Sequence, residues 1–207
     1  MSPAVHILNA SSLPLAELES VAETIRQLLG LPVSVAHHRL ELERAFDSSR
    51  VQYNSSVLLA QLLSTQSNTT TGLTGRELHS RPDIGSGVRT PSQFLQINKL
   101  IAIVDVDLYI PVLTFVFGEA QLEGTAAIVS THRLSNAFYG VDENSSLLLE
   151  RLTKELVHEL GHTFGLFHCK QFECVMRSST YVEEIDLKKA TLCEKCTRML
   201  FEKIRHR

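Results

Sequence analysis

One stretch near the C-terminal end of the chain decides how the rest must fold: His158-Glu159-Leu160-Gly161-His162-Thr163-Phe164-Gly165-Leu166-Phe167-His168-Cys169. On a helix, His158 and His162 project from one face about a turn apart, close enough to hold one metal ion. Glu159 lies beside them, where its carboxylate can act on a metal-bound water. Gly165 allows a left-handed residue after the helix, so that His168 returns as a third ligand. Three histidine ligands leave one coordination position open for water, which is the arrangement of a zinc-dependent hydrolase.

The chain holds four cysteines, and all of them lie at or after the end of this stretch: Cys169, Cys174, Cys193 and Cys196. They form two pairs with short spacings, which suit a tetrahedral zinc site once a loop brings the pairs together. The N-terminus has no basic region and only a short apolar run, so we expect no signal peptide. Without secretion, a reducing compartment disfavours two disulfides. A structural zinc ion is therefore the preferred interpretation, with disulfides or free thiols as the alternatives.

Composition and charge exclude several classes of protein. A chain of 207 residues with 43% hydrophobic residues is long enough for one domain, or for one domain with a small appendage. A net charge of −3 gives no general attraction to nucleic acid or to an anionic membrane, so neither is expected as a partner. No stretch approaches the roughly 20 apolar residues that span a bilayer. We expect a cytoplasmic, intracellular protein that is a monomer.

Upstream of the histidines, the hydrophobic pattern predicts an α/β scaffold. The expected strands cover residues 3–10, 32–36, 99–104, 113–117 and 126–130, and the expected helices cover residues 15–29, 55–63 and 145–164. Residues 99–104 are apolar after the first, as in a central parallel strand that is buried on both faces. Only a short connection, Gly118–Gly124, separates the last two strands, so residues 113–117 should run antiparallel. The sequence thus predicts a mostly parallel mixed sheet with flanking helices and one antiparallel edge strand, to which an extended peptide can pair.

The sequence divides into an expected N-terminal subdomain, residues 1–165, and an expected C-terminal subdomain, residues 166–207. The first carries the sheet and the active-site helix, and the second carries Met176 and the cysteine site. Residues 64–91 are rich in Ser, Thr, Asn, Gly and Pro, which predicts a flexible loop. Plain disorder is the simpler interpretation of this loop, and a substrate lid is the sharper one. On the active-site helix, Glu150 and Lys154 should form an exposed ion pair.

These motifs resemble those of the metzincin clan, whose members carry a long zinc motif and a methionine turn. Here the zinc motif covers residues 158–168, and Met176 follows it. The four cysteines narrow the resemblance to the archaemetzincins (archaelysins), the metzincins that add a four-cysteine structural zinc. Other segments, such as Asp107–Pro111, are also similar, so the resemblance covers most of the chain from Ala4 to Cys196.

The resemblance implies a metzincin-like fold with two Zn²⁺ ions per chain, one catalytic and one structural. The implied ligands are His158, His162 and His168 for the catalytic zinc, and Cys169, Cys174, Cys193 and Cys196 for the structural zinc. Met176 would be the turn methionine beneath the catalytic zinc, and Glu159 would be the general base.

The sequence therefore predicts a zinc metallopeptidase that acts on a peptide or protein substrate. A zinc-activated water would attack the peptide bond, with Glu159 as general acid/base. The alternative is a catalytically silent, zinc-containing peptide-binding or interaction module, in which the fourth coordination position is blocked. A nucleic-acid-binding zinc protein is disfavoured by the net charge. Because His168 and Cys169 are adjacent, damage to the cysteine site should also weaken the catalytic zinc site.

Overall fold

The computed structural model describes the backbone of residues 3–71 and 98–205, and within these ranges the side chains of all but residues 65–71. The main sheet has five strands in the order β2-β1-β5-β8-β7. Its strands are β1 (Val5–Asn9), β2 (Val33–His37), β5 (Lys99–Val104), β7 (Gly118–Ala120) and β8 (Ala126–Ser130). A smaller sheet joins β3 (Phe46–Asp47), β4 (Gln52–Asn54) and β6 (Leu108–Tyr109).

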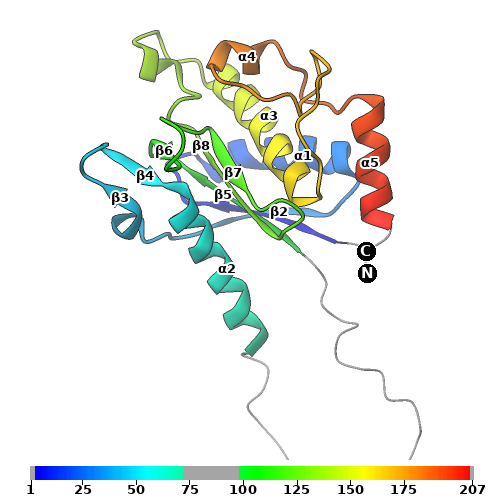
Figure 1. Cartoon of the computed structure of the whole chain (residues 1–207), viewed down its shortest axis with the longest axis horizontal. Helices are drawn as coiled ribbons and strands as arrows, with labels where there is room; N and C mark the ends of the chain where they lie inside the picture. Colours follow the sequence, from blue (N-terminus) through cyan, green and yellow to red (C-terminus); the bar gives the residue numbers. More distant parts are fainter. Residues whose placement is uncertain (1–2, 72–97, 206–207) are drawn as a thin grey trace, which may run out of the picture.

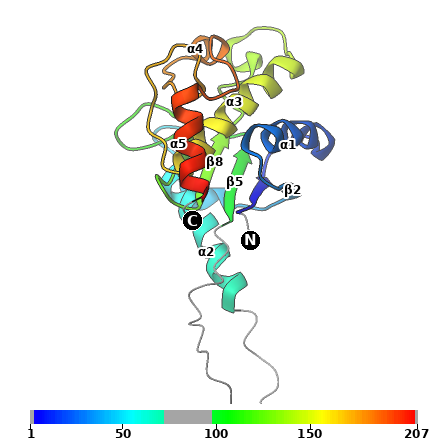
Figure 2. The same ribbon diagram turned by 90° about the vertical axis from the view of Figure 1, so that its right-hand side faces the viewer.

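Helices cover both faces of the main sheet. They are α1 (Leu15–Leu29), α2 (Ser55–Thr71), α3 (Ser145–Thr163), α4 (Val182–Asp186) and α5 (Glu194–Arg205), with short 3-10 helices at Leu42–Ala45 and Asn136–Tyr139. Figures 1 and 2 show α1, α3 and α5 on one side of the sheet and α2 on the other. Alternation along β8 explains the two layers, because Ala127 and Val129 pack with α1 and α3, whereas Ala126 and Ile128 pack with α2.

The centre of the sheet agrees with the sequence prediction. β1, β2, β5 and β8 are parallel to one another, and β5 is the central strand. Residues 101–104 of β5 are fully buried, as expected for a strand with helices on both faces. The four parallel strands lie within the predicted segments or differ from them by one residue.

The antiparallel edge strand exists, but it begins later in the chain than predicted. The sequence placed it at residues 113–117, whereas β7 pairs Gly118–Ala120 with β8. Val116 instead bridges to Leu108 of the small sheet, and Phe117 packs into the main core. The apolar run is therefore divided between two cores, and Gly118–Ala120 after it form the edge strand.

The helix α2 is longer than predicted. It ends at Thr71, so residues 64–71, which the sequence placed at the start of a flexible loop, are helical. Leu58, Leu59 and Leu62 pack this helix against the sheet. Once such a helix has formed, each further residue adds a hydrogen bond at little additional entropy cost. The rest of the predicted loop, residues 72–91, lies outside the described residues.

The segment after α3 shares the main core with the sheet. Met176, Ile185 and Leu200 belong to the same buried cluster as Ile7 of β1 and Ile101 of β5. The core is thus continuous across the boundary expected at residues 165 and 166, and the division into two subdomains stays a prediction. Among the described helices, none is long and apolar enough to cross a membrane. The monomeric state also stays a prediction.

One predicted ion pair has a different environment from the one expected. Lys154 does bind Glu150, with the two charged atoms 2.7 Å apart, but the Lys154 side chain is buried. Its ammonium also donates to the carbonyl of Asp186 at 3.3 Å. The pair is therefore exposed on the Glu150 side only, because the segment that carries α4 covers the lysine.

Candidate active site and metal centres

The helix α3 carries two of the three predicted histidine ligands. The side chain of Asn144 caps its start by accepting the N–H of Leu147. His158 and His162 lie near its other end, with their Nε2 atoms 3.1 Å apart. His168 joins them from the following segment, and the three ligand atoms lie within 4.8 Å of one another. The structure thus brings the predicted histidines close enough to share one metal ion.

Backbone carbonyls orient two of the three imidazole rings. Nδ1 of His158 lies 2.8 Å from the carbonyl oxygen of Val175, and Nδ1 of His162 lies 2.7 Å from that of Leu166. A ring that donates from Nδ1 keeps its Nε2 lone pair for a metal. Burial lowers the pKa of all three histidines, most strongly that of His158. The rings are therefore neutral at pH 7, which is the form that binds metal.

A left-handed glycine turns the chain from α3 toward His168, as predicted. Gly165 has a φ of +93°, and a Cβ at this position would collide with the side chain of Glu123. The N–H of Glu123 donates to the carbonyl of His162 at 3.0 Å. The buried ammonium of Lys99 donates to the carbonyl of Thr163 at 2.7 Å. Carbonyls at the end of the helix thus have partners, and the turn is held from the sheet side.

Glu159 is buried between α3 and the edge strand. The residue is 5% exposed, and a Cβ at Gly118 of β7 would lie 2.8 Å from both its Cγ and its Oε1. The absence of a side chain at Gly118 lets β7 pass directly beside the carboxylate. Burial raises the pKa of Glu159 well above its ordinary value, the charges of Glu155 and Glu119 raise it further, and Lys188 lowers it. A carboxyl group with so perturbed a pKa beside three histidines is a candidate acid/base group.

Met176 packs against α3 next to the histidines. Its side chain is fully buried, and a Cβ at Gly161 would collide with its Sδ. Gly161 therefore allows the turn that carries Met176 to approach the helix one residue before His162. The carbonyl of Met176 accepts the N–H of Cys169 at 2.9 Å, which ties this turn to the residue after His168.

The four cysteines converge in a second group. Cys169 and Cys174 come from the segment after α3, and Cys193 and Cys196 lie at the start of α5. All four are free thiols, and their sulfur atoms lie within 4.8 Å of one another. The arrangement contains no disulfide and matches the donor set of a tetrahedral zinc site.

Backbone N–H groups donate hydrogen bonds to two of these sulfur atoms. The N–H of Cys193 donates to Sγ of Cys174, and the N–H of Gln171 donates to Sγ of Cys169. The donor–acceptor distance is 3.4 Å in both bonds. Burial raises the pKa of Cys174 and Cys196. Burial acts in the same direction on Cys193, but hydrogen bonds from the backbone and thiol of Cys196 and from the other two thiols outweigh it and lower its pKa to about 7. A metal ion that replaces the thiol protons would suit this group.

Comparisons with known proteins point to one family. The family model described as peptidase family M54 matches residues 92–202. The Archaemetzincin of Haloquadratum walsbyi is 34% identical over 95% of this chain and 99% of its own length. The Archaemetzincin of Natronomonas pharaonis is 33% identical over 95% of this chain and 98% of its own. The chain belongs to peptidase family M54, the archaemetzincins.

Solved structures of similar proteins have the same fold. A zinc-dependent peptidase from Methanocorpusculum labreanum superposes with a TM-score of 0.79 at 31% identity, covering 95% of this chain and 100% of that one. Archaemetzincin from Methanopyrus kandleri superposes with a TM-score of 0.72 at 31% identity, covering 99% and 96%. The predicted family and the predicted mixed α/β fold are confirmed. As a member of peptidase family M54, the chain is a zinc metallopeptidase, and its substrates are peptides or proteins.

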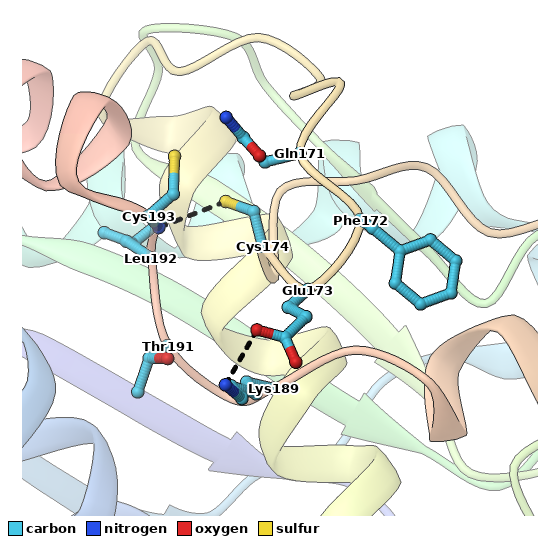
Figure 3. Close-up of a pocket in the computed structure, with 8 residues that line it drawn as sticks. All are labelled: Gln171, Phe172, Glu173, Cys174, Lys189, Thr191, Leu192 and Cys193. Atoms are coloured by element: carbon cyan, nitrogen blue, oxygen red, sulfur yellow. Dashed lines mark hydrogen bonds and ion pairs between the residues drawn. The ribbon is translucent and has the colours of Figure 1, made fainter.

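In this M54 peptidase, a cavity lies beside the cysteines. It has a volume of about 310 Å³, and its walls come from Gln171–Cys174 and from Lys189, Thr191, Leu192 and Cys193. Figure 3 shows Lys189 and Glu173 bonded to each other at its side, with 2.7 Å between the charged atoms. No histidine is among its lining residues. The cavity therefore belongs to the cysteine-bearing loops and not to the histidine cluster.

Sequence reasoning missed the groups that hold the M54 site in place. It assigned Gly118 to a connection, whereas Gly118 belongs to β7 and contacts Glu159. It also gave no sign that the carbonyls of Val175 and Leu166 orient the histidines. A backbone acceptor is present at every residue, so no residue type marks the position where one is used.

Proposed function

We propose that the chain hydrolyses peptide bonds with a zinc ion bound by His158, His162 and His168, and with Glu159 as general acid/base. One observation carries the proposal. Three neutral imidazoles converge beside a buried carboxylate, and backbone carbonyls orient two of them. Three nitrogen donors with an open fourth position are the ligand set of a catalytic zinc ion.

The chemistry divides between the metal and Glu159. When bound, zinc lowers the pKa of a coordinated water to about 7 and polarises the scissile carbonyl group. Glu159 accepts the proton of the attacking water and then donates it to the leaving amine. Burial raises the pKa of Glu159, and the charge of Lys188 opposes this effect. A zinc ion bound nearby would oppose it as well, and so would favour the carboxylate form that the first proton transfer needs.

The edge strand offers a place for the substrate backbone. β7 lies at the edge of the main sheet, and its Gly118 contacts Glu159. An extended peptide that pairs with this strand would therefore run beside the carboxylate. The absence of a side chain at Gly118 supports this arrangement, because a Cβ there would displace Glu159 from the strand.

We further propose a second zinc ion at Cys169, Cys174, Cys193 and Cys196, which makes two zinc ions per chain. Four thiolates fill a tetrahedral site, so this ion has no open position for water and its role is structural. The site would join the segment after His168 to the start of α5. Its binding free energy would then contribute to the folding of both segments.

The test compares Glu159→Gln with the matched variant Glu150→Gln on the same helix. The Glu150 side chain is 58% exposed, and glutamine can still accept the hydrogen bond from Lys154. Metal content and cleavage of a quenched-peptide library are measured for both variants and for the wild type. We expect Glu159→Gln to keep its metal and lose about 10²- to 10⁴-fold in kcat/KM, the range of general acid–base catalysis. Glu150→Gln should cleave like the wild type.

Two outcomes would contradict the proposal in different ways. Wild-type rates in Glu159→Gln would show that another group acts as the base. No cleavage of any peptide by metal-replete wild-type protein would favour the catalytically silent peptide-binding module instead.

A further inference from the structure

A buried ion pair joins α3 to the turn of residues 174–177, here called the methionine turn. Lys188 follows α4 and is 3% exposed, and Glu155 of α3 is 4% exposed. The ammonium of Lys188 donates to Oε1 of Glu155 at 3.1 Å and to the carbonyl of Arg177 at 3.1 Å. One side chain therefore binds both the active-site helix and the methionine turn.

Stability alone does not account for this pair. Removing two charges from water opposes folding, and apolar residues of similar volume often serve as well in such positions. Leu152, Leu156 and Leu160 of the same helix already supply apolar packing, and Arg151, His158 and Glu159 are buried polar neighbours of Glu155. The pair is better explained by the elements that it holds together.

The pair lies where it sets the distance between α3 and the methionine turn. His158 is three residues after Glu155 on the helix, and its Nδ1 bonds to the carbonyl of Val175 in the turn. Arg177, which accepts the hydrogen bond from Lys188, is two residues after Val175. A shift of the turn would therefore move the Val175 carbonyl and rotate the imidazole of His158.

Other parts of the site are held by bonds that the pair does not make. His162 takes its orientation from the carbonyl of Leu166. On the side of the cysteines, the N–H of Val175 donates to the carbonyl of Thr191 at 3.0 Å. Loss of the pair should therefore disturb His158 more than His162, and should reach the cysteine cluster only through Cys174, the first residue of the methionine turn.

We infer that Lys188 and Glu155 are positioning residues of the metal centre, which fix the methionine turn against α3 and so orient His158. The inference rests on the proposed function, in which His158 binds the catalytic metal. Glu155 offsets the charge of Lys188, so the pair orients a ligand without adding net charge beside a metal ion. Burial, and after it the charge of Lys188, lower the pKa of His158 and His168, which places the ammonium within electrostatic reach of the cluster.

The test replaces the pair by apolar residues, as Lys188→Met/Glu155→Met. The matched control is Lys154→Met/Glu150→Met. It removes another buried lysine together with the glutamate that it binds, and both residues lie on α3, the helix that also carries Glu155. Lys154 bonds to Glu150 and to the carbonyl of Asp186, and neither partner belongs to the methionine turn. Two samples of each protein are prepared: one carries Co²⁺ at the histidine site and zinc at the cysteine site, so that its d–d bands report the histidine ligands, and one carries Co²⁺ at both sites, so that its thiolate charge-transfer bands report the cysteine site. Chelator competition gives the metal affinity of the histidine site.

We expect Lys188→Met/Glu155→Met to shift the d–d bands and to lower the metal affinity of the histidine site about 10- to 100-fold, the effect of removing an outer-shell partner of a ligand. The thiolate bands should change less than the d–d bands, because only Cys174 of the four cysteines belongs to the methionine turn. The zinc-loaded enzyme should lose kcat at an unchanged KM. The control variant should keep the d–d bands and the metal affinity.

Wild-type bands and affinity in Lys188→Met/Glu155→Met would overturn the inference, and so would equal losses in the two double variants. Should the first variant fail to fold, Lys188→Met/Glu155→Gln provides the same comparison with a polar side chain of unchanged volume. Failure of the wild type itself to bind metal at the histidines would instead contradict the proposed function.

Discussion

The two candidate metal clusters are built in different ways. The histidine cluster stands on a 19-residue helix that is packed against the sheet, and backbone carbonyls set two of its rings. The cysteine cluster stands on two loops and the first turn of α5, and Cys169 and Cys193 are only partly buried. Regular structure therefore positions two of the three histidines, whereas irregular segments carry His168 and most of the cysteines.

This difference separates what the fold determines from what a metal must supply. His158 and His162 are held by hydrogen bonds to backbone carbonyls and by the packing of α3, whereas His168 is exposed. The thiols gain little from one another, since Sγ of Cys169 and Sγ of Cys193 are 3.8 Å apart and a thiol is a weak donor. We therefore expect the geometry of His158 and His162 to persist without metal. The cysteine-bearing loops should need a bound metal ion to keep their structure.

Cys193→Ser gives the largest expected effect on stability. It removes one of the four thiolates, so the chain should bind one zinc ion instead of two. Structural zinc contributes roughly 10–16 kcal/mol in zinc-finger peptides, so even a partial loss exceeds the about 1 kcal/mol of a typical substitution. Metal analysis and thermal unfolding measure both consequences. Two zinc ions per chain in this variant would contradict the proposed cysteine site.

Cys169→Ser sharpens this test because Cys169 directly follows His168. It should destabilise the protein as Cys193→Ser does, and should in addition weaken metal binding at the histidines. Wild-type catalytic-zinc affinity in Cys169→Ser would show that the shared backbone does not couple the clusters.

Gly118→Ala should affect catalysis without affecting metal content. The added Cβ would lie 2.8 Å from Oε1 of Glu159 and 2.8 Å from the carbonyl oxygen of Ile128, so the carboxylate must move. A displacement of about 1 Å can lower a rate by roughly 100-fold, and we expect kcat to fall by about 10- to 100-fold. Steady-state kinetics on a cleaved peptide, together with zinc analysis, measure the change.

The control for this prediction is Ala120→Gly, which also changes one methyl group on β7. If the loss in Gly118→Ala came from a general disturbance of the edge strand, Ala120→Gly would lower kcat similarly. If it comes from the contact with Glu159, Gly118→Ala alone should lower kcat strongly.

Local spacing predicted the convergence of the histidines better than it predicted the long-range contacts around them. The histidines and Gly165 could be grouped because helix geometry and a left-handed turn are properties of a few consecutive residues. β7 was misplaced because the choice of strand depends on which core Val116 and Phe117 reach. The pair of Lys188 and Glu155 gave no signal, because its members are 33 residues apart and a lysine beside another lysine is typical of a solvated surface.

Lys203→Ala gives the smallest expected effect and asks by which route the two clusters communicate. One route is the peptide bond between His168 and Cys169; the other is the ion pair of Lys203 in α5 with Glu123, whose N–H donates to the carbonyl of His162. The two side chains are 40% and 53% exposed, so the pair should contribute only about 0–1 kcal/mol to stability. Chemical unfolding and chelator competition should therefore give values close to the wild type.

A loss of catalytic-zinc affinity as large as that of Cys169→Ser would instead make α5 the route. Cys193→Ser releases the start of α5 and keeps the peptide bond, so its catalytic-zinc affinity should then fall with that of Lys203→Ala.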